Sequence, residues 1–169
     1  GYIAPDTGLI DAPLARGQAE RHRMVVADGA GSRSSVTTFT VLERFEAGRF
    51  DDGYTLIECK LFTGRTHQIR AHLDYISHAC VGDPLYGMAS SRPRAQLGLT
   101  RQFLHSYKLS FTHPHTGQEL LFVDALPDDL SDALASIEGE SMGRTQAGSE
   151  TLEALEMLPS RATFTGGVR

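Results

Sequence analysis

Hydrophobic and polar positions alternate along the first half of the chain in a way that predicts two strands. Residues 36–45 are rich in β-branched and aromatic side chains, which favour strands. Residues 54–61 alternate with a period of two, which is typical of a strand with one buried face. The apolar face of this second strand would carry Thr55, Ile57, Cys59 and Leu61. The polar segment 47–53 separates the two runs, so we expect a β-hairpin with a long loop.

A helix is predicted directly after the second strand, over residues 66–77. Its buried face is indicated by residues at helical spacing, namely Ile69, His72, Leu73 and Ile76. Strand and helix meet at Gly64 and Arg65, and unpaired backbone N–H groups at a helix start favour anions. Two arginines, two histidines and a glutamine crowd this junction. We therefore expect a place that holds a phosphate or a carboxylate.

The remaining pattern predicts a second hairpin and two further helical segments. Turn residues at 82–87 follow the helix. Strands at 104–111 and 119–125 form a second hairpin around a turn at 113–117. A short helix begins at Asp128 with acidic residues in its first turn. Residues 151–158 add a further helical piece, and we expect much of 140–169 to be mobile.

Charge divides the 169 residues into a body and a tail. The net charge is −5. Residues 128–169 carry eight acidic and three basic residues, whereas residues 1–127 carry 13 of each sign. A sequence pI of 5.8 lacks the usual basic footprint of a nucleic-acid-binding protein. The most basic segment lies within 1–35, and it is either a solvated loop or an arm that contacts phosphates.

Several classes of site and location are disfavoured. No apolar run approaches membrane-spanning length, and the first residues do not form a signal peptide. Cys59 and Cys80 have no metal-type spacing and indicate reduced core residues of a cytoplasmic protein. His67 and His72 would lie about 140° apart around a helix, so they do not share a face. We therefore expect no metal site.

The central motif is specific. It reads Thr63-Gly64-Arg65-Thr66-His67-Gln68-Ile69-Arg70, and Gly82-Asp83-Pro84-Leu85-Tyr86-Gly87 follows it. Earlier in the chain stands Ile10-Asp11-Ala12-Pro13-Leu14, and later Leu104-His105 with His113-Pro114. These blocks, in this order, closely resemble the RluA-type family of RNA pseudouridine synthases. The resemblance covers about residues 1–127, the C-terminal part of the family's catalytic domain, and leaves 128–169 as an acidic helical or mobile tail.

The resemblance implies an α+β fold, with a mixed, mostly antiparallel sheet and flanking helices. It also implies an activity and roles for particular residues. The family isomerises uridine to pseudouridine in structured RNA, such as rRNA or tRNA, without a metal or an organic cofactor. Arg65 matches the family's basic residue that pairs with a catalytic aspartate, and Ile69 matches the apolar residue that lines the base pocket. The predicted RNA contacts are Arg21, Arg23, Arg33, His67, Gln68 and Arg70.

One part of the family's pattern is absent. The catalytic aspartate belongs to an H-R-L-D-type motif, and the His-Arg pair found here, His22-Arg23, is followed by Met24. Asp83 is expected to bond the amides of its own turn rather than to replace that aspartate. We therefore expect this chain to need a missing N-terminal part of the same protein. The alternatives are a stand-alone RNA-binding module without catalysis and a fragment that has no function.

Overall fold

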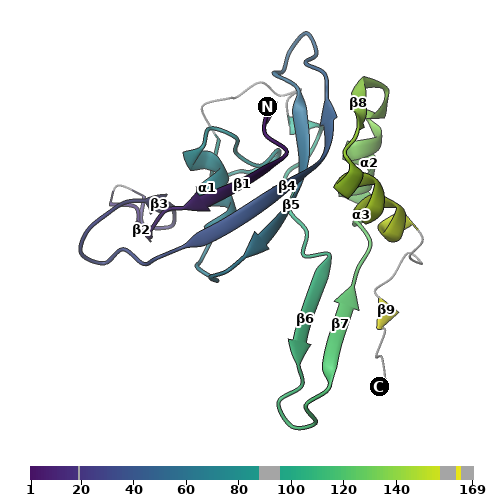
Figure 1. Ribbon diagram of the computed structural model, residues 1–169. Helices are drawn as coiled ribbons and strands as arrows, with labels where there is room; N and C mark the ends of the chain where they lie inside the picture. The colour runs from purple at the N-terminus through teal and green to yellow at the C-terminus, as the bar shows by residue number, and fades with distance from the viewer. Residues whose placement is uncertain (19, 88–95, 157–162, 165–169) are drawn as a thin grey trace.

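The computed structural model describes residues 1–18, 20–87, 96–156 and 163–164, with only the backbone of the last pair. An antiparallel sheet runs through its centre, in the order β1 (Thr7–Asp11), β4 (Val36–Phe45) and β5 (Tyr54–Leu61) (Figure 1). The two long strands have the predicted bounds. The hairpin loop between them ends at Gly53, whose φ of 74° is accessible to glycine at little cost.

One face of this sheet is covered by helix α1 (Gln68–Tyr75). The core between them consists of Ile3, Ile10, Ala12, Phe39, Val41 and Leu73, all buried. Ile57 and Cys59 pack against this cluster, which confirms the predicted inner face of β5. Gly8 leaves room for the ring of Phe39 against β1, because a Cβ at this position would lie 2.3 Å from that ring. Both cysteines are free thiols, and burial raises the pKa of each to about 12.

Helix α1 is shorter than the predicted 66–77. It begins only at Gln68, because His67 has a left-handed backbone with a φ of 53°. It ends at Tyr75, since Ser77 also turns left-handed with a φ of 65°. The amide of His78 then bonds the carbonyl of Leu73 at 2.8 Å, a Schellman-type helix end.

A small ribbon forms the arm that carries the basic N-terminal segment. It pairs β2 (Leu14–Arg16) with β3 (Met24–Val26) in antiparallel register. Leu14 is buried with Ala71 of α1 and with Tyr86, so the ribbon is attached to the helix by a second apolar cluster. The loop that follows β3 and leads into β4 extends away from the sheet (Figure 1).

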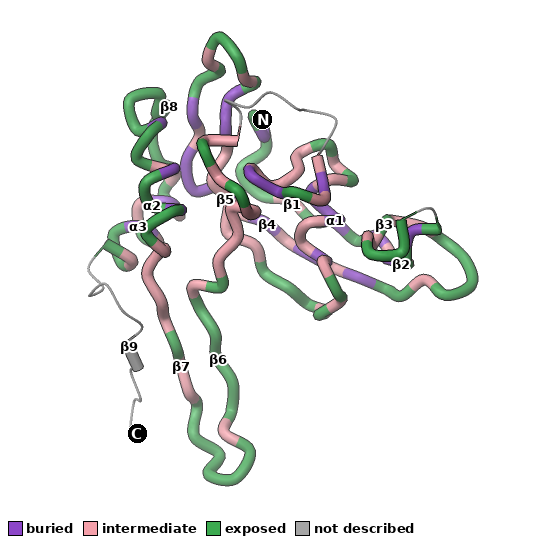
Figure 2. The backbone as a smooth tube through the Cα atoms, turned by 180° about the vertical axis from the view of Figure 1, so that it is seen from behind, coloured by how far each residue is buried: buried purple, intermediate pink, exposed green. Residues whose placement is uncertain are grey.

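The second hairpin projects from the body. It pairs β6 (Lys108–Thr112) with β7 (Glu119–Val123), and β9 (Thr163–Phe164) adds to β7. Every residue of β6 is exposed, and Figure 2 shows the hairpin as mostly exposed backbone. The predicted strands 104–111 and 119–125 differ from these bounds. The backbone amide of Phe103 donates to the carbonyl of Val81, and the hydroxyl of Tyr107 donates to the carboxylate of Glu58. These bonds hold the chain before Lys108 against the segment around Val81 and against β5, so β6 begins only at Lys108.

The acidic tail contributes ordered elements to the body. Helix α2 (Asp128–Ala135) has the predicted acidic first turn and is followed by the 3-10 helix η2 (Glu138–Glu140). Strand β8 (Ser141–Arg144) pairs with the Glu43–Phe45 end of β4, and helix α3 (Gln146–Glu156) packs beside it. The expectation of a largely mobile segment after residue 140 is therefore wrong for residues 141–156. The predicted helix at 151–158 is longer at its start, and its residues 157–158 lie outside the described part.

Close contacts explain why the tail is fixed. Gly148 lets α3 approach β4, because a Cβ at this position would lie 1.9 Å from the carbonyl oxygen of Leu42. The hydroxyl of Thr145 donates to the carbonyl of Val41 at 2.7 Å and accepts from the amide of Gly148 at 3.0 Å. Thr145 thereby caps the helix and ties it to β4. Within the described residues, no helix has the length and apolar character needed to cross a membrane.

Candidate functional site

The predicted strand-to-helix junction is a tight loop between β5 and α1. Phe62 continues the strand, since its amide bonds the carbonyl of Val36 at 3.1 Å. Residues 63–67 then turn the chain into α1, with His67 as the left-handed residue at the helix start. The amide of Gln68 bonds the carbonyl of Arg65 at 3.1 Å, which closes this turn.

The Gln68 side chain holds the loop in place from inside. It is 3% exposed. Its Oε1 accepts from the amide of Arg65 at 3.0 Å and from the hydroxyl of Thr63 at 2.8 Å. Its Nε2 donates to the carbonyl of Val36 at 3.0 Å and to Oγ1 of Thr37 at 3.1 Å. Every hydrogen bond that an amide side chain can make is therefore used within the protein. The predicted RNA contact of Gln68 does not fit this burial, and the Arg65 amide is not free to bind an anion.

The network continues through His72. Its Nδ1 lies 2.9 Å from Oγ1 of Thr37, and its Nε2 lies 2.9 Å from the carbonyl of Ala12. A carbonyl only accepts, so Nε2 carries the proton and Nδ1 accepts from the hydroxyl of Thr37. Burial lowers the pKa of His72, although the Ala12 carbonyl and the charge of Asp11 oppose that shift. The ring is thus neutral, and it links α1 to β4 and to the end of β1.

Arg65 presents its guanidinium beside this rigid loop. Its side chain is half-buried, and Nε donates to the carbonyl of Ser34 at 3.3 Å. Within the described part of the chain, no carboxylate forms an ion pair with it. A half-buried arginine without an acidic partner is a candidate for binding an external carboxylate or phosphate.

Arg70 has an acidic partner inside the chain. Its Nε and one terminal nitrogen donate to the two carboxylate oxygens of Asp83 at 2.7 and 2.6 Å. The Asp83 side chain is fully buried and also accepts from the amides of Leu85 and Tyr86. Burial acts to raise the pKa of Asp83, but the bonds from Arg70 and the two amides outweigh it, so the pKa is lowered. The expectation that Asp83 bonds the amides of its own turn is confirmed.

Tyr86 lies between two arginines. The guanidinium carbons of Arg23 and Arg70 lie 4.8 and 4.9 Å from its ring centroid. Its hydroxyl accepts from the amide of Met24 at 2.8 Å and donates to the carbonyl of the same residue at 3.1 Å. Arg23 also pairs with Asp74 of α1 at 3.0 Å. Tyr86 therefore holds the β2–β3 ribbon against the helix that follows Arg65.

A profile of the RNA pseudouridylate synthase family matches residues 3–75. Ribosomal large subunit pseudouridine synthase D of Nitrosomonas europaea is 46% identical over 134 residues, which are 77% of this chain and 36% of that protein. The RNA pseudouridine synthase YlyB of Bacillus subtilis, an uncharacterized protein, is 42% identical over 138 residues, which are 81% of this chain and 41% of that protein. The chain belongs to the RluA-type family of RNA pseudouridine synthases.

The fold agrees with this family. The human RNA pseudouridylate synthase domain containing 1 superposes with a TM-score of 0.68 at 26% identity. The match covers 94% of this chain and 63% of that one. The mixed α+β architecture predicted from the sequence is confirmed. The chain spans about two fifths of the length of the curated relatives it matches.

The arginines predicted to contact RNA fall into two groups. Arg23 and Arg70 have carboxylate partners in the fold, so their guanidinium groups are already engaged. Arg21 is exposed in the β2–β3 loop, and Arg33 is exposed next to Ser34, whose carbonyl accepts from Arg65. The predicted RNA contacts of Arg21 and Arg33 stay predictions, whereas those of Arg23 and Arg70 would require an ion pair to open.

Ile69 and His67 flank the start of α1. Ile69 is partly buried and packs against the core beneath the sheet, next to the junction. His67 is half-buried with its ring edge toward Tyr86, at 5.8 Å between centroids. Burial and the nearby Arg70 lower the pKa of His67, although Asp83 opposes that shift. The neutral ring can offer a nitrogen to an RNA hydroxyl or base, and this role also stays a prediction.

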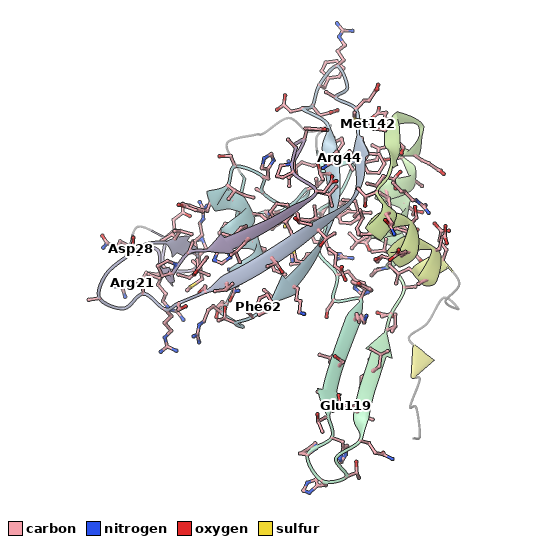
Figure 3. All side chains as sticks on the ribbon, viewed as in Figure 1. Arg21, Asp28, Arg44, Phe62, Glu119 and Met142 are labelled. Carbon is pink, nitrogen blue, oxygen red and sulfur yellow. The ribbon has the colours of Figure 1, made fainter. Side chains whose placement is uncertain are left out.

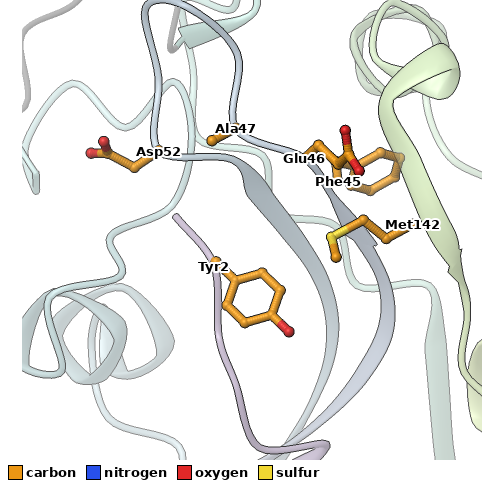
Figure 4. A pocket seen from close by; sticks show the side chains of 6 residues that line it. All are labelled: Tyr2, Phe45, Glu46, Ala47, Asp52 and Met142. Carbon is orange, nitrogen blue, oxygen red and sulfur yellow. The ribbon is translucent and has the colours of Figure 1, made fainter.

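One further feature of the described residues lies away from the junction. A hollow lined by Tyr2, Phe45, Glu46, Ala47, Asp52 and Met142 sits at the opposite end of the β4–β5 hairpin from Arg65 (Figure 4). No group of three or more metal-ligating side chains occurs among the residues that the structure describes. The contribution of Thr63, Thr37 and Tyr86 to this site could not be predicted from the sequence, because it arises only when β4, the loop and the 82–87 turn come together in the fold.

Proposed function

We propose that this chain forms the RNA-facing part of a site that isomerises uridine to pseudouridine in structured RNA. In this proposal Arg65 pairs with a catalytic aspartate that is supplied by a segment outside these 169 residues. The observation that carries it is the Arg65 guanidinium, which has no carboxylate partner in the described part of the chain although the loop beneath it is fixed by Gln68. Family membership and the short span relative to the relatives support the same assignment.

The chemistry expected of Arg65 follows from burial. A carboxylate in a cleft is costly to ionise unless it is paired and hydrogen-bonded. A guanidinium next to it lowers the pKa of that carboxyl group and fixes its direction. Ile69, at the start of α1, would offer an apolar contact to the base once it has left its stack. Removing a base from its stack costs a few kcal/mol, which such contacts offset.

The substrate is expected to be ribosomal RNA. Several relatives bear the name ribosomal large subunit pseudouridine synthase D. A transfer RNA is the other structured substrate that fits the same chemistry. The reaction would take place in the cytoplasm, in keeping with the free thiols of Cys59 and Cys80.

The proposal is tested by measuring pseudouridine formation in two proteins. The 169-residue chain alone is incubated with ribosomal and transfer RNA that lack the modification, and the full-length protein that contains it is assayed in parallel. We expect conversion by the full-length protein and none by the chain alone, although the chain should bind the RNA. Turnover by the isolated chain would contradict the proposed division of the site, and no turnover by the full-length protein would contradict the function itself.

A further inference from the structure

The two faces of the central sheet differ in what covers them. α1 covers the face that carries Thr37, Phe39 and Ile57. Side chains alternate along a strand, so Lys60 and Phe62 lie on the opposite face. The register places Lys60 beside Thr38 of β4, which in turn is paired with Leu9 of β1. We call the end of this surface that carries Leu9, Thr38, Lys60 and Phe62 the open face.

Two apolar side chains are exposed on the open face. Phe62 is 61% exposed and Leu9 is 64% exposed. At the other end of the sheet this side is covered by the tail, because Tyr54 and Leu56 pack with Leu134 and Ile137. Figure 3 shows Phe62 at the opposite end of the sheet from Met142.

One cation contacts Phe62, and two others lie on neighbouring segments of the chain. The ammonium nitrogen of Lys60 lies 5.5 Å from the centroid of the Phe62 ring, within the range of a cation–π contact. Arg65 follows three residues later, and Arg33 adjoins Ser34, the residue that Arg65 contacts. Within the described residues, none of these three cations forms an ion pair with a carboxylate. Asp11 is exposed on the same face, and Glu58 lies on it two residues before Lys60. The face therefore carries charges of both signs, with Lys60 next to Phe62.

We propose that Phe62, flanked by Lys60, is a stacking platform for an unpaired base of the RNA, next to the nucleotide that Arg65 serves. This proposal rests on the proposed function and names a further contact for its RNA substrate. An exposed aromatic ring with nearby cations is how proteins bind single-stranded nucleic acid, because the ring stacks on a base while the cations meet the phosphates. A purely apolar protein partner would leave Lys60, Arg33 and Arg65 without compensation for their desolvation.

The test uses the 169-residue chain and two fluorescent RNA probes, an unstructured oligouridylate and a fully paired duplex of equal length. Phe62→Ala and Phe62→Leu should each weaken binding of the single strand by about 5- to 150-fold, the loss of one stacked base. Phe62→Tyr keeps an aromatic ring and should bind within about twofold of the parent chain. Binding of the duplex should change little in any variant, because its bases are already stacked.

Two controls make the result specific. Tyr75, 60% exposed on α1, is changed to alanine and should leave single-strand affinity unchanged. The unfolding midpoint of Phe62→Ala should equal that of the parent chain, since the ring is mostly exposed. If Phe62→Leu binds as tightly as the parent, the side chain provides apolar contact and not stacking, and the proposal is wrong. Failure of the parent chain to bind the single strand would overturn it as well.

An assay in the full-length protein distinguishes the stacking role of Phe62 from the proposed function. Phe62→Ala is also placed in the full-length protein, and pseudouridine formation is measured at saturating and at low RNA concentration. We expect a raised KM with kcat largely retained. If the full-length protein forms pseudouridine and the variant has an unaltered KM, the proposed function stands, but the stacking role of Phe62 is wrong.

Discussion

The side-chain oxygen of Gln68 accepts a hydrogen bond from the backbone amide of Arg65 at 3.0 Å, so the first residue of α1 fixes the loop that precedes it. The same oxygen accepts from Thr63, while the amide nitrogen of Gln68 reaches β4. The loop therefore keeps its shape without a ligand. Such preorganisation lets an active-site residue act without a cost of ordering at the moment of reaction.

Replacing Gln68 with methionine should destabilise the protein by about 2–4 kcal/mol. The thioether fits a similar volume but leaves the Arg65 amide, the Val36 carbonyl and two hydroxyl groups without their buried partner. Denaturant unfolding monitored by circular dichroism measures the effect. Gln118→Met, at an exposed position of the β6–β7 turn, is the control and should change stability by less than about 0.5 kcal/mol. Equal stability of the two variants would show that the network does not hold the loop.

Tyr86→Phe should loosen the β2–β3 ribbon. The ring stays between its two arginines, but the Met24 amide and carbonyl lose their partner, which costs about 1–3 kcal/mol. Hydrogen exchange at the Met24 amide should become faster, whereas exchange in the centre of β4 should change only with global stability. Tyr75→Phe, at an exposed hydroxyl on α1, should leave both unchanged. Unaltered exchange at Met24 in the Tyr86 variant would mean that the hydroxyl does not anchor the ribbon.

Stability should fall as the pH drops below about 6.5. Burial lowers the pKa of His72, and also those of His67 and His78, from the ordinary value of 6.5. The unfolded chain therefore takes up protons first as the pH falls, and the stability that is complete above pH 6.5 is lost toward the lower folded-state pKa values. The slope is at most about 1.4 kcal/mol per pH unit for each proton.

The contribution of His72 can be isolated by substitution. His72→Gln should reduce the slope of the unfolding free energy between pH 7.5 and 5, because one of the three shifted groups is gone. His115→Gln, exposed in the β6–β7 turn, serves as the matched control and should keep the parent slope. A His72→Gln variant with the full slope would contradict the neutral, buried ring inferred from its two hydrogen bonds.

Gly148→Ala should detach α3 from the sheet. The added methyl group would lie 1.9 Å from the Leu42 carbonyl, so the helix must move away and lose its packing, at a cost of about 1–3 kcal/mol. Gly139→Ala, where no atom lies within 4 Å, is the control. The readout is limited proteolysis after Arg144, which should accelerate only in the Gly148 variant. If both variants resist protease equally, the tail is not held by this contact.

The sequence predicted the local elements well and their long-range partners poorly. β4 and β5 were found because strong alternation and β-branched residues determine them locally. The ends of α1 were missed because His67 and Ser77 adopt left-handed conformations that these residue types rarely take. The ordered tail was missed because Gly148 and Thr145 act through β4, more than a hundred residues earlier in the chain.

The candidate site was predicted in outline. The junction around Arg65 was recognised from its motif, and the structure places it on a rigid loop. The pairing of Arg23 and Arg70 could not be predicted, because a list of basic residues does not show which of them meet a carboxylate in the fold. Their partners, Asp74 and Asp83, lie 51 and 13 residues away along the chain.

The most direct test of this account is the rate of pseudouridine formation by the full-length protein carrying Arg65→Met. Losing the charged partner of a buried carboxylate costs about 3–5 kcal/mol, so the rate should fall by about two to four decades while circular dichroism stays unchanged. Arg70→Met, which breaks the Asp83 pair, should instead lower stability first. A near-normal rate in a folded Arg65→Met protein would contradict the central role assigned to Arg65.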